Sequence, residues 1–159
     1  MPPDLPVMSA ISGLRPTLAR MSLWTDDADR LARFYADLFG FEIAARTTLQ
    51  PMASEAWHLE ADDLIEVLLL RAPRGDTELG ISAVKGRALP PGPTMREAPL
   101  AGSAYLVLYV PDLDAVIARF GGDYNRKPKR LSDPQGRVYY EMAIYDPDGR
   151  VLLVVEDVV

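Results

Sequence analysis

The stretch DADRLARFYADLFGFEI, residues 27–43, decides the fold. Its apolar residues recur at positions i, i+3, i+4 and i+7, which is the spacing of one stripe on an amphipathic helix. Asp26 or Asp27 can cap the start of this helix, and Gly40 suits the left-handed conformation that ends one. Strand-like residues lie on both sides, so we expect a strand, a helix and a strand. The stripe consists of Leu31, Phe34, Tyr35 and Leu38.

The second half of the chain repeats this order. Ala104–Val110 alternates like a strand, Pro111-Asp112 opens a second helix, and Gly121-Gly122 ends it. The same apolar spacing recurs in that helix at Leu113, Val116, Ile117 and Phe120. Further strands are expected over Asp123–Leu131, Val138–Tyr145 and Arg150–Glu156. The order βαβββ therefore occurs twice, which predicts an α+β fold made of a duplicated module.

The first half sets the expected domain limits. Its strands are predicted over Thr17–Thr25, Phe41–Thr47, Ala56–Glu60 and Leu64–Arg71. We expect an N-terminal arm over residues 1–16 and a single domain over 17–156. Within that domain, module one spans about 17–72, a linker about 73–102 and module two about 103–156. Inside the linker, Leu79–Val84 is expected to form a short strand or pairing edge.

Composition excludes several classes of function. The chain has 159 residues and a net charge of −6, which disfavours nucleic acid as a partner. Its short basic run, Arg126–Arg130, is interpreted as a solvated strand or loop. Zero cysteines exclude disulfides and cysteine nucleophiles and fit a reducing cytoplasm. No apolar run is long enough to span a bilayer, so we expect a cytoplasmic protein with no membrane partner.

Three motifs, in this order on the duplicated pattern, resemble the vicinal oxygen chelate superfamily. They are Phe34–Glu42, Val110–Leu113 and Asp146–Arg150. This superfamily includes glyoxalase I, bleomycin resistance proteins and extradiol dioxygenases. The resemblance implies two modules whose strands curl into a cup-shaped mixed sheet, with the helices outside and a small-molecule ligand inside. It also implies that two chains pair as a homodimer, and in metal-dependent members a divalent ion lies in the cup.

The family's metal positions can be placed on this sequence by counting from the motifs. They fall on Arg20 and Tyr105 in the opening strands and on Leu153 in the last strand, and superposition of the closing strands adds Glu66. Only glutamate is a usual ligand, because a guanidinium has no lone pair to donate and leucine has no donor atom. We therefore predict no metal site and no cofactor. The single histidine, His58, is interpreted as a structural residue.

The same register predicts an apolar and aromatic pocket in the cup. Trp24, Tyr105 and Tyr109 would stack on a planar ligand and offer hydrogen bonds. The residues predicted to bind the ligand are Trp24, Ser22, Leu68, Val107, Tyr109, Tyr139, Glu141 and Leu153.

Arg20 and Glu66 support two interpretations. In the first, they form an ion pair that fills the vacated metal position. In the second, they are catalytic together with Tyr105: Arg20 binds an anionic oxygen of the ligand and Glu66 is a general base.

The sequence leaves three functional hypotheses open. The first is a metal-free binding protein similar to bleomycin resistance proteins, for which the acidic charge would suit a cationic ligand. The second is a lyase, isomerase or dioxygenase, working without metal or with a metal held by Glu66 and Glu141. The third is a partner-binding module whose cup is packed core.

Overall fold

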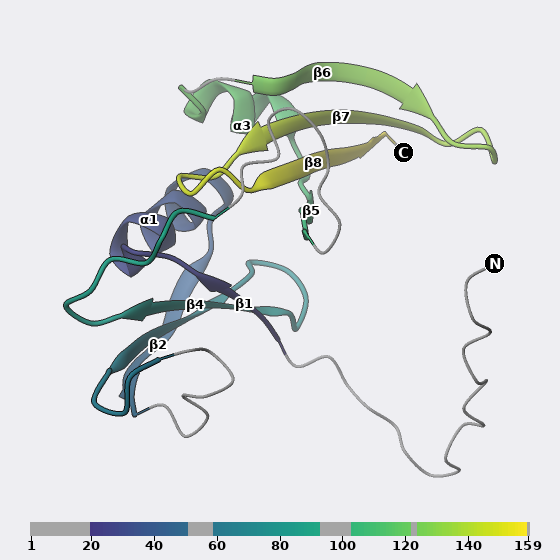
Figure 1. Ribbon diagram of the computed structural model, residues 1–159. Helices are drawn as coiled ribbons and strands as arrows, with labels where there is room; N and C mark the ends of the chain where they lie inside the picture. Colours follow the sequence, from purple (N-terminus) through teal and green to yellow (C-terminus); the bar gives the residue numbers. More distant parts are fainter. Residues whose placement is uncertain (1–19, 51–58, 93–102, 122–123, 159) are drawn as a thin grey trace, which may run out of the picture.

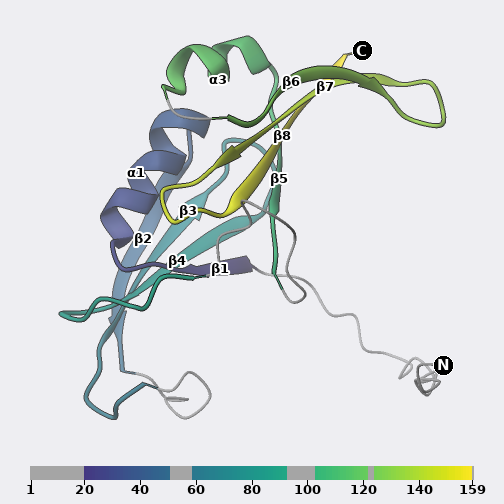
Figure 2. The same cartoon turned by 45° about the horizontal axis from the view of Figure 1, so that its top comes forward.

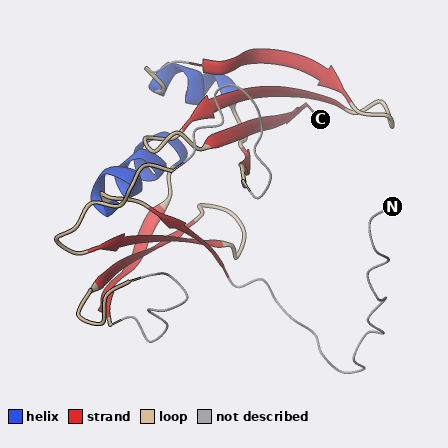
Figure 3. Ribbon diagram, in the orientation of Figure 1, coloured by secondary structure: helices blue, strands red, loops and turns tan. Residues whose placement is uncertain are grey.

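Two four-stranded sheets and two helices form the part of the chain that the computed structural model describes, residues 20–50, 59–92, 103–121 and 124–158. The strands gather in two separate groups, with α1 between them (Figure 3). Strand, helix and three strands follow one another twice along the chain, which confirms the predicted α+β class and duplicated module. Neither of these helices has the length and hydropathy needed to cross a bilayer.

The elements fall into two runs of the same order (Figure 1). The first run is β1 (Arg20–Trp24), α1 (Ala28–Phe39), β2 (Glu42–Leu49), β3 (Ile65–Arg71) and β4 (Glu78–Val84). The second run is β5 (Leu106–Tyr109), α3 (Leu113–Arg119), β6 (Tyr124–Ser132), β7 (Val138–Tyr145) and β8 (Val151–Val158).

Helix α1 has the ends that its sequence predicts. The Asp27 side chain accepts a hydrogen bond from the Arg30 backbone N–H at 2.9 Å. Gly40 ends the helix with a φ of 74°, a left-handed conformation that glycine adopts without steric cost. The predicted apolar stripe faces the core: Leu31, Tyr35 and Leu38 are buried and Phe34 is half-buried.

Helix α3 repeats this design in a shorter form. Asp112 caps it by accepting a hydrogen bond from the Ala115 backbone N–H at 2.9 Å. The Glu156 carboxylate accepts a second one from the Leu113 N–H, so β8 also fixes the start of the helix. Leu113 and Val116 are buried as predicted. The helix ends at Phe120, one residue before the predicted glycine pair.

Both sheets have the same topology, with strand orders β1-β4-β3-β2 and β5-β8-β7-β6. In each, the opening strand pairs in parallel with the closing strand, and the remaining pairs are antiparallel. Strand β4 therefore belongs to the first sheet, whereas the linker was expected to begin at about residue 73. The short strand or pairing edge expected at Leu79–Val84 is present, but as part of this central strand of the sheet and not of a linker.

Some predicted segments lie outside the described residues. These are residues 1–19, most of the expected strand Ala56–Glu60, and residues 93–102 of the expected linker. Leu59 and Glu60 are described and are not in a strand. Within the described chain the two sheets are not joined, and β1 and β5 are edge strands of separate sheets.

The core lies between the helices and the near faces of both sheets. α1 packs on β3 and β4, α3 packs on β8, and the two helices contact each other. Figure 2 shows α1 and α3 following one another along one side of the molecule. One cluster of buried residues spans both modules, from Leu23, Leu68 and Ile81 to Met142 and Val154. The modules therefore share a single hydrophobic core.

Candidate functional site

The side of each sheet that turns away from the helices is called here the far face. Successive side chains of a strand alternate between faces, and directly paired residues share a face. In the second sheet, Leu108, Val154 and Met142 pair in one row and lie in the core. The far face therefore carries the residues that alternate with these. They include Val107 and Tyr109 of β5, Leu153 and Val155 of β8, and Tyr139, Glu141 and Ala143 of β7.

This far face is apolar and open along β5. Tyr109, Val107 and Tyr105, which immediately precedes the strand, are 71%, 43% and 56% exposed. By contrast, Val155, Ala143 and Glu141 in the middle of the sheet are buried. Five of the module-two residues that the sequence assigned to the ligand therefore share this face, namely Val107, Tyr109, Tyr139, Glu141 and Leu153, and Tyr105 immediately precedes β5.

The far face of the first sheet is more polar. Arg20, Ser22 and Trp24 of β1 pair with Glu78, Gly80 and Ser82 of β4, respectively. Arg20 lies 3.9 Å from the Glu78 carboxylate. The Ser22 hydroxyl lies directly over Gly80: a Cβ at that position would be 2.5 Å from the Ser22 Oγ. Glycine at position 80 therefore lets β1 and β4 approach closely.

Glu66 and Leu68 lie on the other face of that sheet. Leu68 pairs with Ile81, which pairs with Leu23, and all three side chains are in the core. Glu66 shares this near face and accepts a hydrogen bond from the Arg46 guanidinium at 2.6 Å. On the far face, β3 contributes Leu69 and Val67 to the rows of Ser22 and Trp24, respectively, with β4 between them.

This placement corrects the expected Arg20–Glu66 pair. Arg20 pairs with Glu78 on the far face, and Glu66 pairs with Arg46 on the helix side. The expectation took β3 as the closing strand of module one, whereas β4 occupies that place. Because side chains alternate along a strand, a register error of one residue moves a side chain to the opposite face. Glu66, Arg20 and Tyr105 therefore do not form one constellation.

The corrected register also fixes the four positions at which the resemblance places metal ligands. Ser22 and Val107 are equivalent positions in the two modules, because each precedes a helix-capping aspartate by five residues. Ser22 pairs with Gly80 and Val107 pairs with Leu153, so Gly80 and Leu153 are equivalent as well. Gly80 therefore replaces Glu66 as the counterpart of Leu153. A guanidinium, a glycine, a phenol and an isobutyl group offer one oxygen donor among them, which does not fit a divalent ion.

The alternative metal ligands are also apart. Glu66 lies on the near face of the first sheet, and Glu141 lies on the far face of the second, where Arg126 binds it at 2.9 Å. No group of three acidic, histidine or cysteine side chains within the described ranges is arranged to hold a metal ion. His58 lies outside those ranges.

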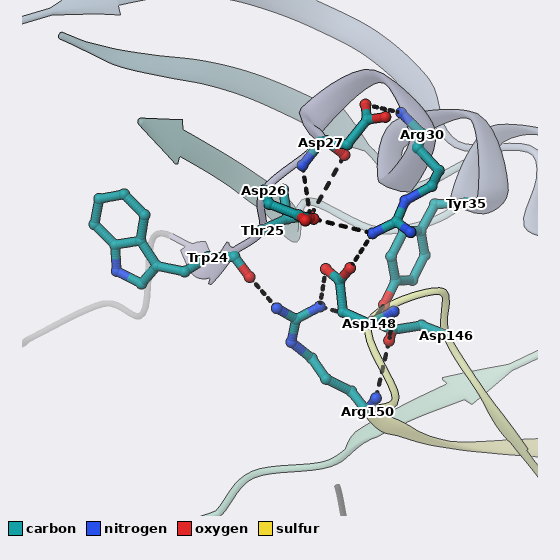
Figure 4. Close-up of polar contacts among 9 residues, drawn as sticks. All are labelled: Trp24, Thr25, Asp26, Asp27, Arg30, Tyr35, Asp146, Asp148 and Arg150. Carbon is teal, nitrogen blue, oxygen red and sulfur yellow. Dashed lines mark hydrogen bonds and ion pairs between the residues drawn. The ribbon is translucent and has the colours of Figure 1, made fainter. Parts of the chain in front are cut away.

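The structure also contains a polar network at the module junction that the sequence did not predict. The Arg150 guanidinium donates hydrogen bonds to Asp146 at 2.9 Å and to Asp148 at 3.0 Å (Figure 4). It also donates one to the backbone carbonyl of Trp24, at the end of β1. Arg30 of α1 forms an ion pair with Asp148. The turn between β7 and β8 is thereby tied to the first module.

Burial and charge set the titration behaviour of this network. Burial disfavours the charged form of Arg150, but hydrogen bonds and charge from Asp146 and Asp148 outweigh it and raise the guanidinium pKa. The Tyr35 hydroxyl donates to Asp146 at 3.4 Å. Burial, reinforced by the Asp146 charge, raises the pKa of the Tyr35 phenol well above its usual value. At neutral pH Arg150 therefore stays charged and Tyr35 stays protonated and neutral, so the network has a structural role.

Several solved structures have a similar architecture. A glyoxalase family protein from Bacillus cereus superposes with a TM-score of 0.73 at 15% identity, covering 95% of this chain and all of that one. A glyoxalase, bleomycin resistance protein and dioxygenase domain from Frankia superposes with a TM-score of 0.59 at 14% identity, covering 91% and 100%. An antibiotic binding protein from a Streptomyces species gives a TM-score of 0.56 at 20% identity, covering 91% and 98%. At these identities the likeness shows the fold.

Sequence comparison supplies the family. No curated protein matches the chain by sequence. The model of the Glyoxalase/Bleomycin resistance protein/Dioxygenase superfamily, however, matches residues 17–153. This match covers most of the chain and agrees with the duplicated βαβββ order. The chain therefore belongs to the Glyoxalase/Bleomycin resistance protein/Dioxygenase superfamily.

Proposed function

We propose that this protein binds a small, partly aromatic molecule on the far faces of its sheets, without the family's metal ion. The observation that carries the proposal is the exposed apolar surface of β5. Val107 and Tyr109 are exposed on one face of the edge strand β5, Tyr105 is exposed immediately before it, and Leu153 continues this surface on β8. Large contiguous apolar patches on a soluble domain usually mark a binding site.

Aromatic side chains suit a planar ligand. Tyrosine presents a flat apolar ring and a hydroxyl that can form a hydrogen bond, so it binds planar molecules with little loss of conformational entropy. Tyr139 adds a third ring position on the same far face. The Streptomyces relative of the same fold is an antibiotic binding protein, which is consistent with small-molecule binding in this superfamily.

A second copy of the chain is proposed to complete the site. Strands β1 and β5 are both sheet edges, and an exposed edge with an apolar face favours pairing with another chain. A homodimer would cover the β5 surface and enclose a ligand between two far faces. Zero cysteines also fit our expectation that the protein works in the cytoplasm.

Binding of a neutral aromatic probe, 2-naphthalenemethanol, tests the ligand site. We expect Tyr109→Ala and Tyr105→Ala each to lower its affinity about fivefold or more, since each removes a stacking ring. Tyr140→Ala is the matched control, because Tyr140 is 37% exposed but lies on the near face of the same sheet. Calorimetric titration measures the dissociation constants. If the wild-type protein binds no aromatic probe, or if Tyr140→Ala has the same effect, the proposal fails.

The oligomeric state is tested separately. Light scattering at micromolar concentration should give the mass of two chains, and Tyr109→Arg should shift the mass toward one chain by placing a charge in the proposed interface. A monomeric mass for the wild-type protein would contradict the homodimer but leave the binding proposal to the titration.

A further inference from the structure

We propose that the far face of the second sheet has an anion-binding end, formed by Arg126 and Lys129 beside Glu141, and that the ligand carries a carboxylate on a planar apolar body. This inference rests on the proposed function and names the class of ligand. It gives a role to a basic segment that the sequence alone identifies only as a solvated strand.

The path of β6 is the first observation. Tyr124 pairs with Ile144 on the near face and packs against the core. In a regular strand Arg126, two residues later, would point to the same side. A register shift between these residues instead places Arg126 opposite Ala143, on the far face. The irregularity therefore turns one cation away from the helices and onto the proposed ligand surface.

A second irregularity follows at once. Lys129 lies three residues after Arg126, a spacing that in a regular strand would put the two on opposite faces. A second register shift between them places Lys129 opposite Glu141, on the same far face as Arg126. Pro128 fits this position because a bulge on an edge strand does not need its missing N–H. Two irregularities thus bracket Arg126, and together they place both cations beside Glu141.

The charges at this end are unequal. Glu141 is only 8% exposed, and Arg126 donates a hydrogen bond to it at 2.9 Å. The Arg126 side chain is still 41% exposed and keeps further N–H groups for an oxygen of the ligand. Lys129 is exposed and has no ion pair with any residue in the described ranges. Two cations therefore surround one carboxylate, and the next acidic register position, Asp157, is one step further along, beside Tyr139.

The apolar part of the surface sets the rest of the ligand. One row of paired residues runs from Lys129 through Glu141 and Val155 to Tyr109. Since neighbouring strands are about 4.8 Å apart, three spacings give a row of roughly 14 Å. A fused aromatic acid placed along this row would have its carboxylate at β6 and its rings toward the exposed Tyr109, above the buried Val155. A cationic ligand would gain little from Glu141, because Arg126 already neutralises the charge of that carboxylate.

Protection of a sheet edge is the simpler explanation for part of this segment. Lysine and proline on an edge strand discourage pairing with another sheet, and this accounts for Lys127 and Pro128. It does not require Arg126 to be turned onto a buried carboxylate. With a net charge of −6, the protein as a whole repels anions. A local pair of cations on the ligand surface is therefore the feature that an anionic ligand would need.

Three probes of one shape test the inference: 2-naphthoate, 2-naphthalenemethanol and 2-naphthylmethylammonium. Near neutral pH the naphthoate should bind about tenfold more tightly than the neutral alcohol, and the ammonium should bind most weakly. Lys129→Gln should lower the preference for naphthoate over the alcohol about threefold to fivefold. Arg130→Gln is the matched control, because it removes the same charge from the same strand but on the Tyr140 side.

Arg126 needs a paired change, because Arg126→Gln alone leaves Glu141 buried without a cation. The double variant Arg126→Gln/Glu141→Gln should lose most of the preference for naphthoate over the alcohol. Equal binding of all three probes, tightest binding of the ammonium, or equal effects of Lys129→Gln and Arg130→Gln would overturn the inference and leave the proposed function standing. If none of the three probes binds the wild-type protein, both fail.

Discussion

At the residue scale, the two D-P-x-G-R turns of module two provide a natural comparison. Residues 133–137 and 146–150 have the same pattern, and each arginine pairs with its first aspartate. The Arg137 side chain is 82% exposed, whereas the Asp146 side chain is fully buried. Asp133 is 15% exposed and Arg150 is 24% exposed, so the first pair is the more exposed of the two, and the second carries the contact between modules.

We predict that Arg150→Met lowers the free energy of unfolding by about 2–4 kcal/mol, because it leaves the buried Asp146 carboxylate without its cation. Arg137→Met should cost less than about 1 kcal/mol, since an exposed ion pair contributes little. Urea unfolding of both variants and the wild-type protein measures the difference. Equal losses in the two variants would contradict the role assigned to the junction.

Tyr35 gives a prediction for alkaline pH. Its pKa is raised in the folded protein above the usual value of 10.0, so its proton is held more tightly in the folded than in the unfolded chain. The stability from this neutral phenol is complete below about pH 10 and is lost as the pH rises further. Above that point it should contribute a decline of up to about 1.4 kcal/mol per pH unit.

The Tyr35→Phe variant checks this decline. It should be somewhat less stable at neutral pH, because it loses the hydrogen bond to Asp146, but it should fall less steeply than the wild-type protein above pH 10. The difference in slope isolates Tyr35 from the other titrating tyrosines and lysines. Parallel declines of the two proteins in melting temperature against pH would show that Tyr35 does not contribute.

At the scale of elements, the close approach of β1 to β4 depends on Gly80. A Cβ there would lie 2.5 Å from the Ser22 Oγ and 3.3 Å from its Cβ. We predict that Gly80→Ala destabilises the protein by about 1–3 kcal/mol, as overpacking does elsewhere. Ser22→Ala removes the nearer atom, so the double variant should recover about 1 kcal/mol. Chemical denaturation of the four proteins completes the cycle, and strictly additive effects would contradict the clash.

The elements that sequence predicted well are those determined by local chemistry. Asp27 and Gly40 fix the ends of α1 because a side-chain cap and a left-handed glycine are local features. The far face of module two was placed by alternation alone, because β5, β7 and β8 are regular. Periodicity and turn residues are sufficient where a strand is unbroken and its partner is the expected one.

The failures arose where pairing between distant segments decides the outcome. The local sequence predicts only a short strand or pairing edge at Leu79–Val84, because the parallel pairing that makes β4 a central strand depends on β1, a segment about sixty residues earlier. That error assigned Glu66 to the wrong face of the sheet and led to a predicted ion pair with Arg20, whereas Glu66 pairs with Arg46. Likewise, the shifts that turn Arg126 come from pairing with β7 and cannot be read from the run Arg126–Arg130.

At the scale of the whole molecule, one core joins two separate sheets. Residues of both modules belong to the same buried cluster, the helices contact each other, and Arg150 ties the second module to Trp24. A destabilising substitution in module two should therefore lower the stability of module one as well. Both tryptophans, Trp24 and Trp57, belong to the first half of the sequence, so their fluorescence reports mainly on that half.

We predict a single cooperative unfolding transition in which tryptophan fluorescence and far-ultraviolet circular dichroism coincide. Val116→Ala, in the buried face of α3, should cost about 2 kcal/mol and move both signals to the same lower urea midpoint. Leu49→Ala, at a position 49% exposed on β2, is the control and should move neither by much. A fluorescence midpoint that stays fixed while the dichroism midpoint falls would show that the modules unfold independently, and would mean that the shared core and the Arg150 junction do not couple them.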